Sequence, residues 1–297
     1  MKIFICFVAT LFVVTACTMD KTDYESETNT VVPDHQVFKE VISFTKEHYT
    51  LRIEAINGHF YQGYNEVHLQ IVDTHTKQAV ENAAVSFLPT RTTPTGGKDS
   101  CPNLYHLVYQ PQEKIYKGFS VFTTESNVAT WEITINFEVN QQIIEVKQPI
   151  VVEKQVNKNL NLTEFEGKDQ ETYILALVAP IKPKVAENEL IAGLYKYNAA
   201  ADLKDRYQTV TDYKLLLDPR MPEPSMGNHS SPNNKDLVQK EGGFYYGVVN
   251  YTMTGNWTLN FILQNQQGRI LRGTKVPTDF TPGIEGVKSE LHIDILF

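Results

Sequence analysis

The sequence is poor in cysteine and has no long apolar run. It contains three cysteines among 297 residues, and two of them, Cys6 and Cys17, lie in the N-terminal segment. With that segment set aside, Cys101 has no cysteine left to pair with, so the fold has to rest on apolar burial without an intramolecular disulfide. No apolar stretch approaches the roughly 20 residues of a membrane-spanning helix. We therefore expect a soluble globular chain after the N-terminal segment.

Positive charge is also scarce. Lysine and arginine number 27 against 35 aspartate and glutamate residues, which gives a formal net charge of −8 at pH 7. This balance argues against nucleic acid or anionic lipid as a partner bound through bulk charge. The sequence also lacks a nucleophile elbow, an HExxH metal motif and a phosphate-binding loop. It therefore predicts a protein that is not an enzyme.

The N-terminus has the pattern of an export signal. Residues 3–14 form an apolar run that follows Lys2, long enough for a signal peptide and too short to span a bilayer. The run closes on Val-Thr-Ala-Cys at positions 14–17, which resembles the lipobox of bacterial lipoproteins. The resemblance implies that residues 1–16 are removed and that Cys17 carries lipid. An ordinary secretory signal that ends near a cysteine is the alternative.

A polar and acidic stretch follows the cysteine. Residues 20–27 show no hydrophobic periodicity, which is typical of a disordered spacer, and we expect a tether over residues 17–45. Acidic residues in this position also resemble a signal for surface display in some bacterial lineages. We expect the protein at the outer membrane, anchored to membrane lipid through Cys17. It would lie on either the periplasmic or the cell-surface face of that membrane.

Beyond the tether the dominant hydrophobic period is two. Apolar and polar residues alternate in several segments, and turn-forming residues separate them. Such alternation predicts antiparallel sheets packed face to face, and no long amphipathic helical pattern competes with it. The sequence therefore predicts an all-β protein built from β-sandwiches. The alternating segments are residues 49–55, 67–71, 131–137, 257–263 and 291–297.

The two halves of this β-rich region resemble each other. Matched residues recur in the same order at offsets of 123 to 130 residues, which indicates a duplicated domain. We predict one domain at residues 46–155 and a second at residues 172–297, joined by a polar linker at residues 156–171. The matched pairs are Tyr49 and Tyr173, Asn65 and Asn188, Cys101 and Ser231, Tyr116 and Tyr245, and Trp131 and Trp257.

The second half carries a family resemblance. Residues 219–234, with residues 243–247 and 253–257 after them, look like the YtkA-like domain, which is related to the FixH family. The resemblance implies two tandem immunoglobulin-like antiparallel sandwiches in an exported protein, in a family that sometimes accompanies copper handling. It is specific over residues 172–297. It is weaker over residues 46–155, because residues 90–97 lack the methionines that the family places there.

One loop of the second half concentrates potential metal ligands. Met221, Met226 and His229 lie within nine residues, and Met253 lies on a strand entering the second sheet. Thioethers select Cu(I) and imidazole binds copper in either oxidation state, so these four residues are a candidate copper site. The alternative is structural, with the methionines filling one end of the sandwich and His229 capping a turn.

The remaining conspicuous side chains have structural interpretations. Trp131 and Trp257 are expected in the cores of the two domains. His68 and His292 lie on polar strand faces and are expected in solvent. Cys101 is expected to be a small buried residue, because no strongly basic neighbourhood surrounds it in the sequence.

Two functions are compatible with these features. The favoured one is a non-enzymatic outer-membrane lipoprotein that acts as a structural or interaction module, as an accessory subunit of a membrane β-barrel or envelope complex. Loops and edge strands of β-sandwiches are suited to that role. The alternative is a copper-binding, metallochaperone-like lipoprotein that uses Met221, Met226, His229 and Met253.

Overall fold

The computed structural model describes residues 37–155 and 159–297. Within these residues regular structure is nearly all β-strand, and the helical segments are the short 3₁₀ turns η1 (Leu203–Asp205) and η2 (Glu241–Gly243). The predicted all-β class is therefore confirmed. Across the described residues no helix combines the length and apolar composition needed to cross a membrane. The expected signal peptide, Cys17 and most of the expected tether lie outside the described residues.

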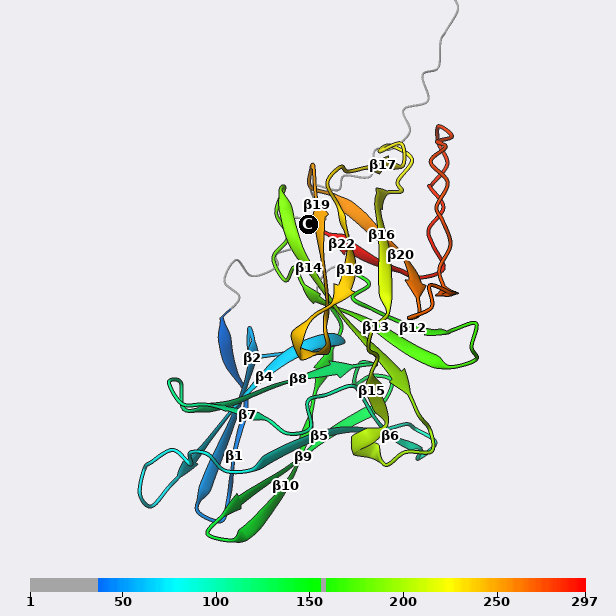
Figure 1. Ribbon diagram of the computed structural model, residues 1–297. Coiled ribbons are helices and arrows are strands. Elements are labelled where there is room, and N and C mark those ends of the chain that lie inside the picture. The colour runs from blue at the N-terminus through cyan, green and yellow to red at the C-terminus, as the bar shows by residue number, and fades with distance from the viewer. Residues whose placement is uncertain (1–36, 156–158) are drawn as a thin grey trace, which may run out of the picture.

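The chain forms two lobes (Figure 1). The first contains two antiparallel sheets, with strand orders β1-β2-β4-β8-β7 and β10-β9-β5-β6, and a short parallel pair, β3 and β11. Alternation places Leu51 and Ile53 in the core between the sheets while Arg52 is exposed. The strands are β1 (Phe38–Lys46), β2 (Tyr49–Ile56), β3 (Phe60–Tyr61), β4 (Gly63–Asp73), β5 (Val85–Thr92), β6 (Lys98–Ser100), β7 (Val108–Gln110), β8 (Ile115–Phe122), β9 (Thr130–Val139), β10 (Gln142–Ile150) and β11 (Val152–Glu153).

The second lobe repeats this order with one change. Strands β12-β13-β14-β19-β18 correspond to β1-β2-β4-β8-β7, and β22-β20-β16-β17 correspond to β10-β9-β5-β6. Its two sheets are continuous because Leu215 of β16 pairs with Leu237 of β18. The strands are β12 (Leu162–Glu166), β13 (Thr172–Ala179), β14 (Glu187–Tyr197), β15 (Tyr207–Thr209), β16 (Lys214–Met221), β17 (His229–Ser230), β18 (Lys235–Gln239), β19 (Tyr245–Asn250), β20 (Asn256–Gln264), β21 (Ile270–Arg272) and β22 (His292–Leu296).

The residues matched between the halves make matching hydrogen bonds. The Asn65 amide nitrogen donates to the carbonyls four and two residues before it, at 2.6 and 2.9 Å. The Asn188 amide nitrogen does the same at 2.8 and 2.7 Å. Each asparagine also accepts from the backbone N–H four residues earlier. The two side chains thus fold the same turn before β4 and β14.

A second matched pair closes a longer loop. The Tyr116 hydroxyl donates to the Val80 carbonyl at 2.9 Å and accepts from the backbone N–H three residues further on. The Tyr245 hydroxyl donates to the Val210 carbonyl at 3.0 Å and accepts from the backbone N–H of Tyr213, again three residues after the carbonyl. Two unrelated sandwiches have no reason to share such details, so these contacts support a duplicated unit.

The predicted domain boundaries differ from the structure at two places. The tether was expected to reach residue 45, but β1 begins at Phe38 and pairs along its length with β2. A register shift between Glu40 and Ile42 interrupts the period of two, which hides this strand in the sequence. The linker was expected over residues 156–171, but β12 lies inside it and pairs with β13.

The prediction that His68 lies in solvent is wrong, because β1 covers this residue. Phe38 of β1 stacks on the His68 ring with centroids 3.6 Å apart, and the residue is buried. His68 Nε2 lies 2.7 Å from Glu66 Oε1, and this hydrogen bond lowers the pKa of the Glu66 carboxyl. His292 is half-buried, with Nδ1 2.8 Å from the Ser289 carbonyl.

The expected burial of Trp131, Trp257 and Cys101 is confirmed. Each tryptophan lies in the core of its own lobe. Burial raises the pKa of the Cys101 thiol to about 12, so the thiolate needed for reaction is scarce at neutral pH. Cys101 is therefore a structural residue.

An aromatic cluster joins the lobes. Phe119 of the first lobe packs against Tyr195 and Phe244 of the second, with ring centroids 6.3 and 5.4 Å away. A Cβ atom on Gly193 would lie 2.5 Å from the Tyr195 hydroxyl oxygen, so Gly193 leaves the space that Tyr195 occupies. At the edge, Arg206 Nη1 lies 3.5 Å from Asp99 Oδ1. These contacts hold the lobes in one orientation.

Candidate functional site

The predicted Met/His loop connects β16 to β17. Met221 ends β16 and lies directly opposite His229, the first residue of β17, in the antiparallel register. The intervening turn is tight, because Gly227 and Asn228 both have positive φ, at 63° and 52°. The His229 backbone N–H donates to the Met226 carbonyl at 3.2 Å. The loop is therefore an ordered turn stabilised by its own backbone.

The two loop methionines face inward. Met221 is fully buried in the core of the second lobe, and Met226 is half-buried against the same core. The backbone at Gly255 approaches Met221 so closely that a Cβ there would lie 2.6 Å from the Met221 methyl carbon. Both contacts are those expected of methionines that fill one end of a sandwich.

His229 and Met253, in contrast, lie at the surface. His229 Nε2 is 3.3 Å from the hydroxyl oxygen of Thr252, the residue next to Met253. Met253 was expected on a strand, but it lies in the bend between β19 and β20. Its side chain is exposed, and its carbonyl accepts a hydrogen bond from Trp257 Nε1 at 3.0 Å. The structure thus brings His229 beside the segment that carries Met253, while Met221 is enclosed below them.

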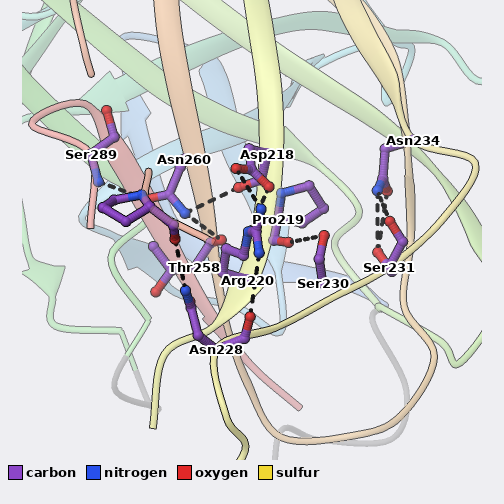
Figure 2. A network of polar contacts seen from close by, with 11 residues as sticks. Asp218, Pro219, Arg220, Asn228, Ser230, Ser231, Asn234, Thr258, Asn260 and Ser289 are labelled. Atoms are coloured by element: carbon purple, nitrogen blue, oxygen red, sulfur yellow. Dashed lines mark hydrogen bonds and ion pairs between the residues drawn. The ribbon is translucent and has the colours of Figure 1, made fainter. Parts of the chain in front are cut away.

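A polar network fixes the start of the loop (Figure 2). Arg220 donates from Nε to Asp218 Oδ1 at 2.8 Å and from Nη2 to Asp218 Oδ2 at 3.2 Å. Its Nη1 donates to the Asn228 carbonyl at 3.5 Å, and Ser230 Oγ donates to the Pro219 carbonyl at 3.1 Å. These contacts hold the backbone of residues 219–230.

The same network holds a long excursion between β21 and β22. Asn228 Nδ2 donates to the Pro277 carbonyl at 3.0 Å, and the Gly286 backbone N–H donates to the Pro222 carbonyl at 2.6 Å. In Figure 1 this excursion projects from the second lobe beside β17. The excursion belongs to the connection from β20 to β22, and in the first lobe the corresponding connection, between β9 and β10, is only the turn Asn140–Gln141. The excursion is therefore an addition of the second lobe.

Burial also affects a carboxyl group in this loop. Glu223 is buried, and the loss of solvent raises the pKa of its carboxyl above the usual value. Asn256 and Lys288 oppose that rise, and the Glu285 carboxylate adds to it. Two of these residues, Lys288 and Glu285, belong to the excursion, so the excursion lies close to the buried Glu223 carboxyl.

We call residues 222–234, 251–255 and 273–290 together the loop face. Its three segments are joined by the contacts of His229 with Thr252, of Gly286 with Pro222, and of Asn228 with Pro277. Several apolar side chains on it are exposed to solvent. They are Met253 at 39%, Phe280 at 44%, Ile284 at 61% and Val287 at 62%.

A further group of side chains was missed in the sequence. His48, Asp73 and His75 offer ligand atoms that all lie within 4.8 Å of one another. His48 occupies the turn between β1 and β2, and Asp73 ends β4. The Asp-Thr-His triplet at residues 73–75, after a predicted strand, could have indicated two of the three residues. The position of His48 could not be predicted, because most of β1 was assigned to the tether.

The strand orders define an all-β protein of immunoglobulin-like sandwich type. No family model matches the sequence, and no curated protein matches it. The solved structures similar to it include a DUF4785 family protein from Legionella pneumophila, with a TM-score of 0.25 and 11% identity over 75% of this chain and 54% of that chain. The chain thus spans about half the length of that protein, and a likeness this weak carries no argument about function. Similarity to the YtkA-like domain stays a prediction.

Proposed function

We propose that the protein is an outer-membrane lipoprotein that acts without catalysis, as a docking module whose loop face contacts another protein of the envelope. One observation carries the proposal: the loop face exposes Met253, Phe280, Ile284 and Val287 on loops that hydrogen bonds tie to one another. Exposed apolar side chains on ordered loops favour association, because no loop has to be ordered at the moment of binding.

The comparison between the lobes supports the choice of surface. Both lobes share one strand order, and the first lobe forms it without the added segment. The segment is therefore not needed for the fold, which favours a functional role for it. The excursion at residues 273–290 is such a segment, and it packs on the loop between β16 and β17. The aromatic cluster around Phe119 would hold this surface at a fixed orientation to the anchored N-terminal end.

Site-specific photo-cross-linking tests the proposal in cells. A photoreactive amino acid at position 284 should form an adduct with one dominant envelope protein, because Ile284 is exposed at the centre of the excursion. Ile143, at 70% exposure on the hairpin of the first lobe, is the matched control and should give no such adduct. Equal adducts at both positions, or an adduct at position 143 alone, would contradict the assignment.

A second candidate is copper binding at the Met/His loop. It is supported by one observation, the proximity of exposed His229 to the segment that carries exposed Met253, with Met226 in the same turn. Met221 would contribute only if its sulfur left the core. Thioether and imidazole together form a ligand set for Cu(I).

Competition with a Cu(I) chelator separates this candidate from a structural loop. If the loop binds copper, the protein should retain one Cu(I) per chain, and His229→Ala combined with Met253→Leu should abolish retention. His106→Ala, an exposed histidine of the first lobe, is the control and should change nothing. Equal loss of copper from wild type and the double variant would leave the loop with its structural role.

A further inference from the structure

We propose that His48, Asp73 and His75 form a binding site for a divalent transition-metal cation of the zinc type at the tip of the first lobe. The site is separate from the loop face, since it lies in the first lobe, at the turn between β1 and β2 and at the end of β4. In Figure 1 the turn between β1 and β2 lies at the end of the first lobe that points away from the second.

The backbone brings the three residues together from two segments. The Thr74 backbone N–H donates to the His48 carbonyl at 2.7 Å, and the Thr74 hydroxyl donates to the same oxygen at 2.9 Å. Next to this link, Asp73 is the register partner of Tyr49 in the β2–β4 pair. The turn that carries His48 is thus bound directly to the turn that carries Asp73 and His75.

The two carboxylate oxygens of Asp73 differ in their contacts. Its Oδ1 accepts from the backbone N–H groups of His75 at 2.7 Å and Thr76 at 3.1 Å, which fixes the carboxylate. Its Oδ2 lies 4.0 Å from His48 Nε2, beyond hydrogen-bond distance. A carboxylate held in this way presents its second oxygen with little further loss of freedom.

The two imidazoles lie face to face. The rings of His48 and His75 are parallel within 2°, with centroids 4.9 Å apart. Stacking places the edges of both rings side by side, but a metal has to lie near the plane of each imidazole that binds it. The exposed His75 ring therefore has to turn before a nitrogen of each ring points to the same position. The His48 side chain is about one-third exposed and the Asp73 side chain one-fifth, so the group differs from a solvated surface cluster of acids.

The distances suit a metal after a small closure. Two ligand atoms on a tetrahedral Zn²⁺ lie about 3.4 Å apart, given metal–ligand bonds of about 2.1 Å. The three ligand atoms here lie within 4.8 Å of one another, so rotation of partly exposed side chains closes the site. Two imidazoles and one carboxylate are a ligand set for Zn²⁺, and they leave a fourth position for water or another ligand.

The test is titration of the full mature lipoprotein in mild detergent with Zn²⁺ alone, in competition with a chromophoric chelator. Wild type should bind one Zn²⁺ per chain at this site. His75→Ala should weaken binding at least about tenfold, the loss that even outer partners of metal ligands cause. Asp73→Asn should weaken it similarly while it keeps an oxygen for the turn amides. His59→Ala, an exposed histidine paired with Glu153, should leave the affinity unchanged.

Three results would overturn the proposal. One is absence of stoichiometric Zn²⁺ uptake by wild type. Another is an unchanged affinity in His75→Ala, whose exposed side chain can be removed without loss of the fold. The third is a loss of Zn²⁺ that follows His229→Ala instead, which would assign the ion to the loop face.

Discussion

Replacing Cys17 with serine is expected to release the protein from the membrane completely. The substitution is best made behind a cleavable secretory signal in place of residues 1–16, so that an uncleaved signal cannot act as an anchor. Serine has no thiol to receive lipid, and each buried CH₂ of an acyl chain contributes about 0.8 kcal/mol of membrane affinity. Metabolic labelling with a fatty acid and membrane sedimentation together measure the outcome.

The matched control for this experiment is Cys101→Ser behind the native signal. Cys101 is the other cysteine that the predicted cleavage before Cys17 would leave, and it lies buried in the first lobe. The control should keep both the label and the membrane fraction. Membrane association that persists in the Cys17→Ser protein without any label would refute lipid anchoring at this residue.

The second large effect is expected from Trp257→Ala. Trp257 is fully buried, packs against Tyr251 at 5.4 Å between ring centroids, and donates from Nε1 to the Met253 carbonyl. Its truncation should destabilise the second lobe by about 3–5 kcal/mol, because it leaves a large cavity and an unpaired carbonyl. Trp257→Phe should cost less, since it restores most of the volume.

Fluorescence resolves the two lobes in this measurement. The sequence has two tryptophans, Trp131 in the first core and Trp257 in the second, so each substitution leaves a reporter in the opposite lobe. Urea unfolding followed by circular dichroism should show the second lobe weakened while the Trp131 signal reports the first. Val238→Ala, an exposed position on β18, should change stability by less than about 0.5 kcal/mol. A similarly small change for Trp257→Ala would contradict its place in the core.

Alternation in the sequence was enough to predict five long strands of the two lobes. It located β2, β4, β9, β20 and β22, because apolar and polar residues alternate along each of them. It missed β1, because the register shift after Glu40 breaks the period. That one irregularity hid the burial of His68 beneath Phe38 as well as the neighbourhood of His48.

Side-chain placement in the candidate site was less predictable. The sequence grouped Met221, Met226 and His229 correctly in one loop, but it gave no sign of which side chains face the core. Burial of Met221 depends on Gly255, which lies more than thirty positions later in the chain. The contact of Phe119 with Tyr195 and Phe244 was equally hidden, because it depends on how the two lobes meet.

The most direct measurement of the proposed docking role is quantitative recovery of the cross-linked partner from membranes that carry substituted proteins. We predict that a triple serine variant of the loop face loses the partner, while a triple variant of equally exposed positions on the first lobe keeps it. Recovery of the partner in equal amounts from both would contradict the assignment of the loop face as the docking surface. The variants are Phe280→Ser, Ile284→Ser and Val287→Ser on the loop face, and Val108→Ser, Val128→Ser and Ile143→Ser as the control.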